Sequence, residues 1–164
     1  LDRANITIDK LFGHVDTTLG RQYYGDAGDL IFYAGPKDTY GLWNPSIAAA
    51  RFEMAHDWMA FSGLAGKTAG GTFAAGTADT NVRGFDILWK SMPLKAHTYI
   101  WNQVTQGGGA LGTGPTMAAA GGKNDNLYVY GLKLRGEAMG GWLNADIAAN
   151  SGENRNNTAP GSWR

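Results

Sequence analysis

The chain has 164 residues, with 14 Lys+Arg balanced by 14 Asp+Glu, so that its formal net charge is zero. A neutral chain lacks the global attraction to phosphates that nucleic-acid-binding domains show, and no nucleic-acid partner is expected. Charged residues make up 17% of the chain, against ~25% in typical soluble domains. With 25 glycines and 12% aromatic residues, the composition excludes a disordered chain and a helical bundle and favours an all-β domain with many turns.

Period-two alternation of apolar and polar residues predicts about eight strands along the chain. They cover residues 4–11, 14–22, 47–55, 58–66, 84–91, 94–104, 127–135 and 142–150. Within the second strand, Arg21 falls in phase with the apolar residues, which predicts a β-bulge near Gly20. The lengths of these strands are close to the ~9–11 residues of a tilted transmembrane strand.

The connections between these strands alternate between short turns and long loops. The long loops cover 23–46, 67–82 and 106–126, whereas two-residue turns occur near 12–13 and 92–93. Outer-membrane barrels show this asymmetry, with tight turns on the periplasmic side and long loops outside. The sequence therefore predicts a transmembrane antiparallel up-and-down β-barrel, with residues 1–164 as one incomplete domain of a larger barrel.

Two stretches resemble the alginate-export family of bacterial outer-membrane barrels. The first is Thr17–Gln22 followed by Gly25-Asp26 and an aromatic-rich loop, which is similar to the family's LGRQ…GD segment. The second, from Leu127 to Asn150, looks like a late hairpin of the same family. Members are considerably longer, so the resemblance implies an internal fragment of a porin-like barrel, with a complete eight-stranded barrel as the alternative. It also implies a basic lumen that conducts an acidic polysaccharide.

Charged residues that alternate with the apolar ones are expected to line a pore. They are Arg21, Arg51, Glu53, Asp86, Lys90, Lys95, Lys133, Arg135 and Asp146. Basic side chains in a pore favour anions, because a low-dielectric wall focuses their field. The alternative is that these charges pair with one another and only keep the lumen hydrated. The loop 23–46 is the candidate for a segment that folds inward and narrows the pore.

Four aromatic residues near predicted strand ends are expected to form girdles at the membrane interfaces. They are Trp58, Trp89, Tyr128 and Trp142. The alternative is that they are ordinary core aromatics of a soluble sheet.

No motif in the chain predicts catalysis, a cofactor or a metal site. The three histidines lack the spacing of metal ligands, and Ser62 or Ser91 with His97 lacks the nucleophile elbow of a hydrolase. Carboxylates at Asp26, Asp29 and Asp38 could bind calcium, but solvated loop acids are the favoured interpretation.

The sequence thus predicts a porin or channel of the bacterial outer membrane, without enzymatic activity. It would pass small hydrophilic or anionic solutes, such as sugar acids or oligosaccharides, by passive diffusion. Its partners would be outer-membrane lipid and the solute, and a homo-oligomer is compatible with this class. Two alternatives stay open: a structural outer-membrane barrel that anchors a surface layer, and a secreted carbohydrate-binding β-sandwich.

Overall fold

A computed structural model describes residues 3–25, 32, 34–35, 46–69, 80–92, 94–105, 125–138, 140–154 and 161–163. These residues form nine strands and contain no helix. The strands are β1 (Ala4–Leu11), β2 (Val15–Gln22), β3 (Ile47–Ala55), β4 (Met59–Ala69), β5 (Thr80–Trp89), β6 (Lys95–Thr105), β7 (Asp125–Ala138), β8 (Gly141–Asn154) and β9 (Gly161–Trp163). Within the described part of the chain, no helix is long and apolar enough to cross a membrane.

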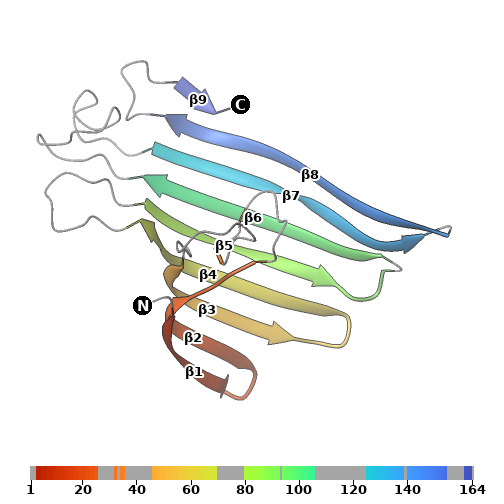
Figure 1. The fold of residues 1–164 in the computed structure, drawn as a ribbon, viewed down its shortest axis with the longest axis horizontal. Helices are drawn as coiled ribbons and strands as arrows, with labels where there is room; N and C mark the ends of the chain where they lie inside the picture. Colours follow the sequence, from red (N-terminus) through yellow and green to blue (C-terminus); the bar gives the residue numbers. More distant parts are fainter. Residues whose placement is uncertain are drawn as a thin grey trace, which may run out of the picture.

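The strands form a single antiparallel sheet in which each strand pairs with the next one along the chain. Figure 1 shows this sheet as one curved layer, with β1 near one edge and β9 at the other. Short turns join β1 to β2, β3 to β4, β5 to β6 and β7 to β8, and we call this end of the sheet the turn end. We call the opposite end the loop end, because the long connections 23–46, 70–79 and 106–124 start from it. The predicted all-β, up-and-down topology is confirmed.

The hairpin of β7 and β8 is longer than its sequence pattern predicts. Each strand has 14 residues, and pairing continues through Glu137 with Trp142 to Ala138 with Gly141. The strands are separated by residues 139–140 alone, and Gly140 has a φ of 77°. A glycine that accepts this φ permits a two-residue connection, so the two strands extend beyond the predicted bounds 127–135 and 142–150.

The predicted bulge near Gly20 is wrong. Pairing of β2 with β3 runs without interruption from Asp16 to Gln22, and the irregularity in pairing with β1 lies between Ile8 and Leu11. Gly20 has a φ of 119°, which a residue without Cβ adopts without an inserted residue. Arg21 therefore keeps the phase of Leu19 and lies on the face opposite to that of Arg51.

Cross-strand partners share a face, which divides the sheet into two chemically different surfaces. The polar face carries the row Glu53, Ser62, Asp86, Tyr99 and Gly131. The apolar face carries the row Phe52, Gly63, Phe85, Ile100 and Tyr130.

Burial follows a pattern opposite to that of a soluble sheet. On the apolar face, Ile6 is 70% exposed and Ile147 68% exposed. On the polar face, Ile47, Leu64 and Trp101 are at most 7% exposed. The core cluster therefore lies on the polar face, and the described residues leave the large apolar side chains of the other face uncovered.

Candidate functional site on the polar face

A segment of the connection between β2 and β3 covers part of the polar face. Tyr24 and Ala34 form an isolated antiparallel bridge, with N–H···O distances of 2.7 Å and 2.8 Å in the two directions. Both residues are buried, and Figure 1 shows this part of the chain in front of the sheet. The described part of the 23–46 connection thus lies against the face that carries the charged residues, where an inward-folded segment was expected.

Aromatic packing holds this segment on β6. The rings of Tyr24 and Phe32 lie 5.3 Å and 4.9 Å from the ring of Trp101, measured between centroids. The Tyr24 hydroxyl is 3.2 Å from Ser62 Oγ on β4, and the Arg51 guanidinium lies over the Tyr24 ring at 5.3 Å. Burial raises the pKa of the Tyr24 hydroxyl to about 12, so that this phenol stays protonated at neutral pH.

Two glycines provide the space that the large aromatic side chains of β6 occupy. A Cβ added to Gly131 on β7 would lie 2.6 Å from the Tyr99 hydroxyl, and a Cβ added to Gly84 on β5 would lie 2.6 Å from Trp101 Cε3. Because Gly131 leaves this space, the Tyr99 side chain passes over β7 and donates to Asp146 Oδ1 on β8 at 2.7 Å.

The acidic groups at the centre of the polar face have basic or hydroxyl partners. Glu53 Oε1 accepts from Arg51 Nη2 at 2.5 Å, and Asp86 Oδ1 lies 2.8 Å from His97 Nδ1. The buried Arg51 Nε has no hydrogen-bond partner within the described part of the chain. A buried N–H of this kind is a position where water or a solute can bind.

Three cationic side chains and a histidine form a basic block across β6 and β7, near the turn end. Lys95 is paired in register with Arg135, and His97 with Lys133. Like charges placed directly opposite each other on one face of a sheet are unfavourable. The Lys133 ammonium lies 5.4 Å from the centroid of the Tyr99 ring, a cation–π contact that partly offsets this cost. Such a basic block is the arrangement that attracts anions.

A cavity of about 260 Å³ joins these features. Three basic and two acidic side chains line it, together with His97 and the aromatic residues of the docked segment. The cavity brings together the predicted residues Arg51, Glu53, Asp86, Lys133 and Arg135.

Lys95 and Asp146 lie on the same polar face, next to this cavity. Lys90 does not, because β5 ends at Trp89 and Lys90 belongs to the following turn, where its Nζ donates to the backbone oxygen of His56 at 2.9 Å. Arg21 is on the apolar face. The expectation that Arg21 and Lys90 share the surface of the other charged residues is therefore wrong.

The predicted girdle residues lie at both ends of the sheet. Trp58 and Trp89 stack at the turn end, with ring centroids 5.8 Å apart, and Tyr128 is on the apolar face towards the loop end. Trp142 pairs with Glu137, which is in phase with Arg135, so Trp142 has the alternation of the polar face. Trp142 thus lies apart from the other three.

Sequence reasoning missed the aromatic part of the site. Tyr99 and Trp101 have the phase of the charged residues of their strand, but the alternation of charged residues alone does not predict that aromatic side chains line the site. The signal was present: Trp101 is in phase with His97 and Tyr99, and the 23–46 connection is rich in aromatic residues. Such residues on a polar face indicate that something apolar packs there.

The candidates for other chemistry have different surroundings. Ser62 Oγ contacts Tyr24, His97 pairs with Asp86, and Ser91 lies exposed in a turn. Within the described residues, no group of three or more metal-ligating side chains occurs. Asp26, Asp29 and Asp38 lie outside those residues.

No family model, curated protein or solved structure matches this chain.

Proposed function

We propose that this sheet is part of a transmembrane β-barrel of the bacterial outer membrane, and that its polar face lines a pore for small hydrophilic or anionic solutes. The burial pattern, with a covered polar face and an exposed apolar face, supports the transmembrane barrel. A sheet whose charged face holds the core cluster and whose apolar face lies open matches a barrel in lipid, because lipid solvates the apolar face and water fills the lumen. Closure would also pair the edge strands, as lipid requires.

The basic block supports a pore for anionic solutes. Lys95, Lys133 and Arg135 lie side by side on the polar face, with Asp146 of β8 opposite Lys133. The direct opposition of Lys95 and Arg135 is an unfavourable like-charge contact, and it is better explained by attraction of anions than by hydration of a lumen alone. Sugar acids and acidic oligosaccharides are solutes of the matching charge.

The mechanism needs no cofactor. Solutes would diffuse along the polar face, and the segment around Tyr24 would narrow their path. The basic block would then raise the local concentration of anions at this constriction. Selectivity would be set by side-chain charge and by the volume that the aromatic cluster leaves open.

The test is single-channel recording of the protein in planar bilayers under a KCl gradient. We expect a reversal potential with the sign of anion preference, and a shift towards cations in Lys133→Gln/Arg135→Gln. The matched control, Lys10→Gln/Lys90→Gln, removes the same charge from the turn end of the sheet and should leave the reversal potential unchanged.

A protein that stays in the soluble fraction without detergent would contradict the barrel and favour the secreted β-sandwich. Insertion without conductance would contradict the pore and favour a barrel that anchors a surface layer.

A further inference from the structure

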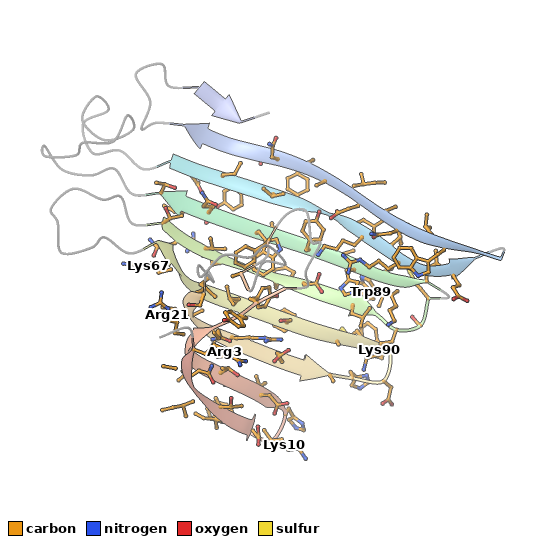
Figure 2. All side chains as sticks on the ribbon, in the orientation of Figure 1. Arg3, Lys10, Arg21, Lys67, Trp89 and Lys90 are labelled. Carbon is orange, nitrogen blue, oxygen red and sulfur yellow. The ribbon has the colours of Figure 1, made fainter. Side chains whose placement is uncertain are left out.

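Among the described residues, the apolar face carries positive charge at the loop end only. Arg21 on β2 and Lys67 on β4 both pair with Ala48 of β3, so that they lie in one row, two strands apart. At the usual strand spacing, this separates their backbones by about 10 Å. Arg83 on β5 lies one step further from the loop end, paired with Ala65. Figure 2 shows Arg21 and Lys67 at this end of the sheet, and Lys10 and Lys90 at the other.

The two arginines are held in place by neutral side chains. Arg83 Nε donates to Asn102 Oδ1 at 3.0 Å, and Asn102 is itself 4% exposed and donates to Asn126 Oδ1 at 2.6 Å. Arg21 Nε donates to Ser46 Oγ at 2.6 Å. Each of these bonds uses one of the five N–H donors of a guanidinium, and neither neutralises its charge.

The acidic residues of the strands around this row belong to the other face. Among the described side chains of β2 to β7, these residues are Asp16, Glu53, Asp86 and Glu137, and each belongs by its register to the polar face. Next to Arg83, a groove of about 310 Å³ is lined by Asn81, Arg83, Asn102 and Val104. Cations, amides and a groove therefore border directly on the large apolar side chains of the same face.

We infer that this basic row binds the phosphorylated head group of a membrane lipid in the leaflet that meets the loop end. A lipid whose acyl chains lie on the apolar residues would place its phosphate at the polar boundary, where the guanidinium groups can donate in pairs. The turn end carries Trp58 and Trp89 on its boundary instead, which predicts no such binding there. This inference rests on the proposed function, because it requires the apolar face to meet lipid.

The test compares two matched double variants of the full protein in neutral detergent. Lys67→Gln/Arg83→Gln removes two cations of the row, and Lys10→Gln/Lys90→Gln removes two exposed cations at the turn end. Native mass spectrometry would measure binding of diphosphoryl lipid A, of its dephosphorylated analogue and of inorganic phosphate. We expect about a 25-fold loss of lipid A affinity in the first variant, at about fivefold for each cation, and no change in the second. Arg83→Lys should restore part of the affinity lost in Arg83→Gln. It keeps the positive charge but lacks the paired N–H donors of the guanidinium.

Flotation with phosphatidylcholine vesicles separates failure of this inference from failure of the proposed function. Protein that enters vesicles but binds the phosphorylated and dephosphorylated lipids equally would overturn the inference alone. Saturation of the row by inorganic phosphate at the same affinity as lipid A would also overturn it, since the site would then bind free anions. Protein that does not enter the vesicles would overturn the proposed function itself.

Discussion

The two faces of the sheet solve the problem of burial in opposite ways. The polar face of β3 to β6 is covered by its own chain, through Tyr24, Phe32 and Ala34, and its polar groups meet partners at hydrogen-bonding distance. The apolar face presents large side chains such as Ile6, Tyr130 and Ile147 outward, without a covering layer among the described residues. In a soluble protein the covered face would be the apolar one.

The surroundings of the sheet, rather than the strand pattern, therefore determine which face is covered and which face is exposed. Alternation fixes only which residues share a face. Covering a face that carries Arg51, Glu53 and Asp86 is favourable only if those charges find partners, and the apolar face is stable only if its surroundings are apolar too.

The first prediction concerns an apolar and a charged residue that are adjacent in the middle of β7. Leu132 lies on the apolar face between Thr98 and Ile147, and Lys133 on the polar face between His97 and Asp146. We expect Leu132→Arg to cost about 2–4 kcal/mol of unfolding free energy, because it places a charge at the centre of the lipid-facing surface. Denaturant titration of the protein in lipid vesicles would measure this cost.

Lys133→Leu is the matched control, since it changes the neighbouring residue in the opposite sense. It should fold normally and shift the ion selectivity of the pore. If Leu132→Arg proved harmless while Lys133→Leu prevented folding, the two faces would be inverted.

The second prediction concerns the cover of the polar face at high pH. Because the pKa of Tyr24 is raised to about 12 in the folded protein, the neutral phenol is the form that the site stabilises. This stabilisation is fully present below pH ~10, the ordinary pKa of tyrosine, and is lost as the pH rises through the folded value. A difference of this size corresponds to about 2–3 kcal/mol.

Unfolding midpoints measured between neutral pH and the alkaline limit would show the loss. Tyr24→Phe should be slightly less stable than the natural protein at neutral pH, having lost the contact with Ser62, and should lack this part of the alkaline transition. Parallel pH curves for the two proteins would contradict a buried, protonated Tyr24.

The third prediction tests how Tyr99 reaches across β7. Gly131→Ala would place a methyl group against the backbone oxygen of Ile147 and the Tyr99 hydroxyl. The pairing of β7 with β8 must then shift locally, the Tyr99 ring must move, and its bond to Asp146 should break. We expect a cost of about 1–3 kcal/mol, as for overpacking elsewhere. Tyr99→Phe removes the same hydrogen bond while keeping the ring. A double-mutant cycle in denaturant should therefore show non-additive effects, and additive effects would mean that Gly131 and the hydrogen bond are independent.

Much of the fold could be predicted because period-two alternation is a local property of the chain. The two-faced pattern of residues such as Leu132 and Lys133 needs no long-range information, and the alternation of short and long connections gives the up-and-down order. The ends of β7 and β8 could not be predicted in the same way. Glycine at 136 and 140 weakens the strand pattern, and only pairing with the partner strand keeps those residues in the sheet.

The site was predictable in its charges but not in its aromatic cover. Arg51, Asp86 and Lys133 alternate visibly with apolar neighbours, and their shared face follows from this phase. The contact of Tyr24 with Ser62 joins residues 38 positions apart, and no local pattern specifies such a contact. The placement of Arg21 failed for a related reason, since a cation in phase with apolar residues was interpreted as a change of phase rather than as a charge at the boundary of the apolar face.

The smallest expected effect concerns the ion pair of Arg51 and Glu53. Their side chains are 31% and 41% exposed, and a pair of this kind contributes about 0–1 kcal/mol to stability. Glu53→Gln should therefore leave the unfolding midpoint nearly unchanged, but it leaves the charge of Arg51 without its partner at the cavity. The reversal potential of the pore should shift towards anions, and Arg51→Gln, the matched variant of opposite sign, should shift it towards cations. Since both substitutions have small effects on stability, a change in selectivity would report directly on the field at the polar face. Two unchanged reversal potentials would place this pair, and with it the centre of the polar face, outside the path of the ions.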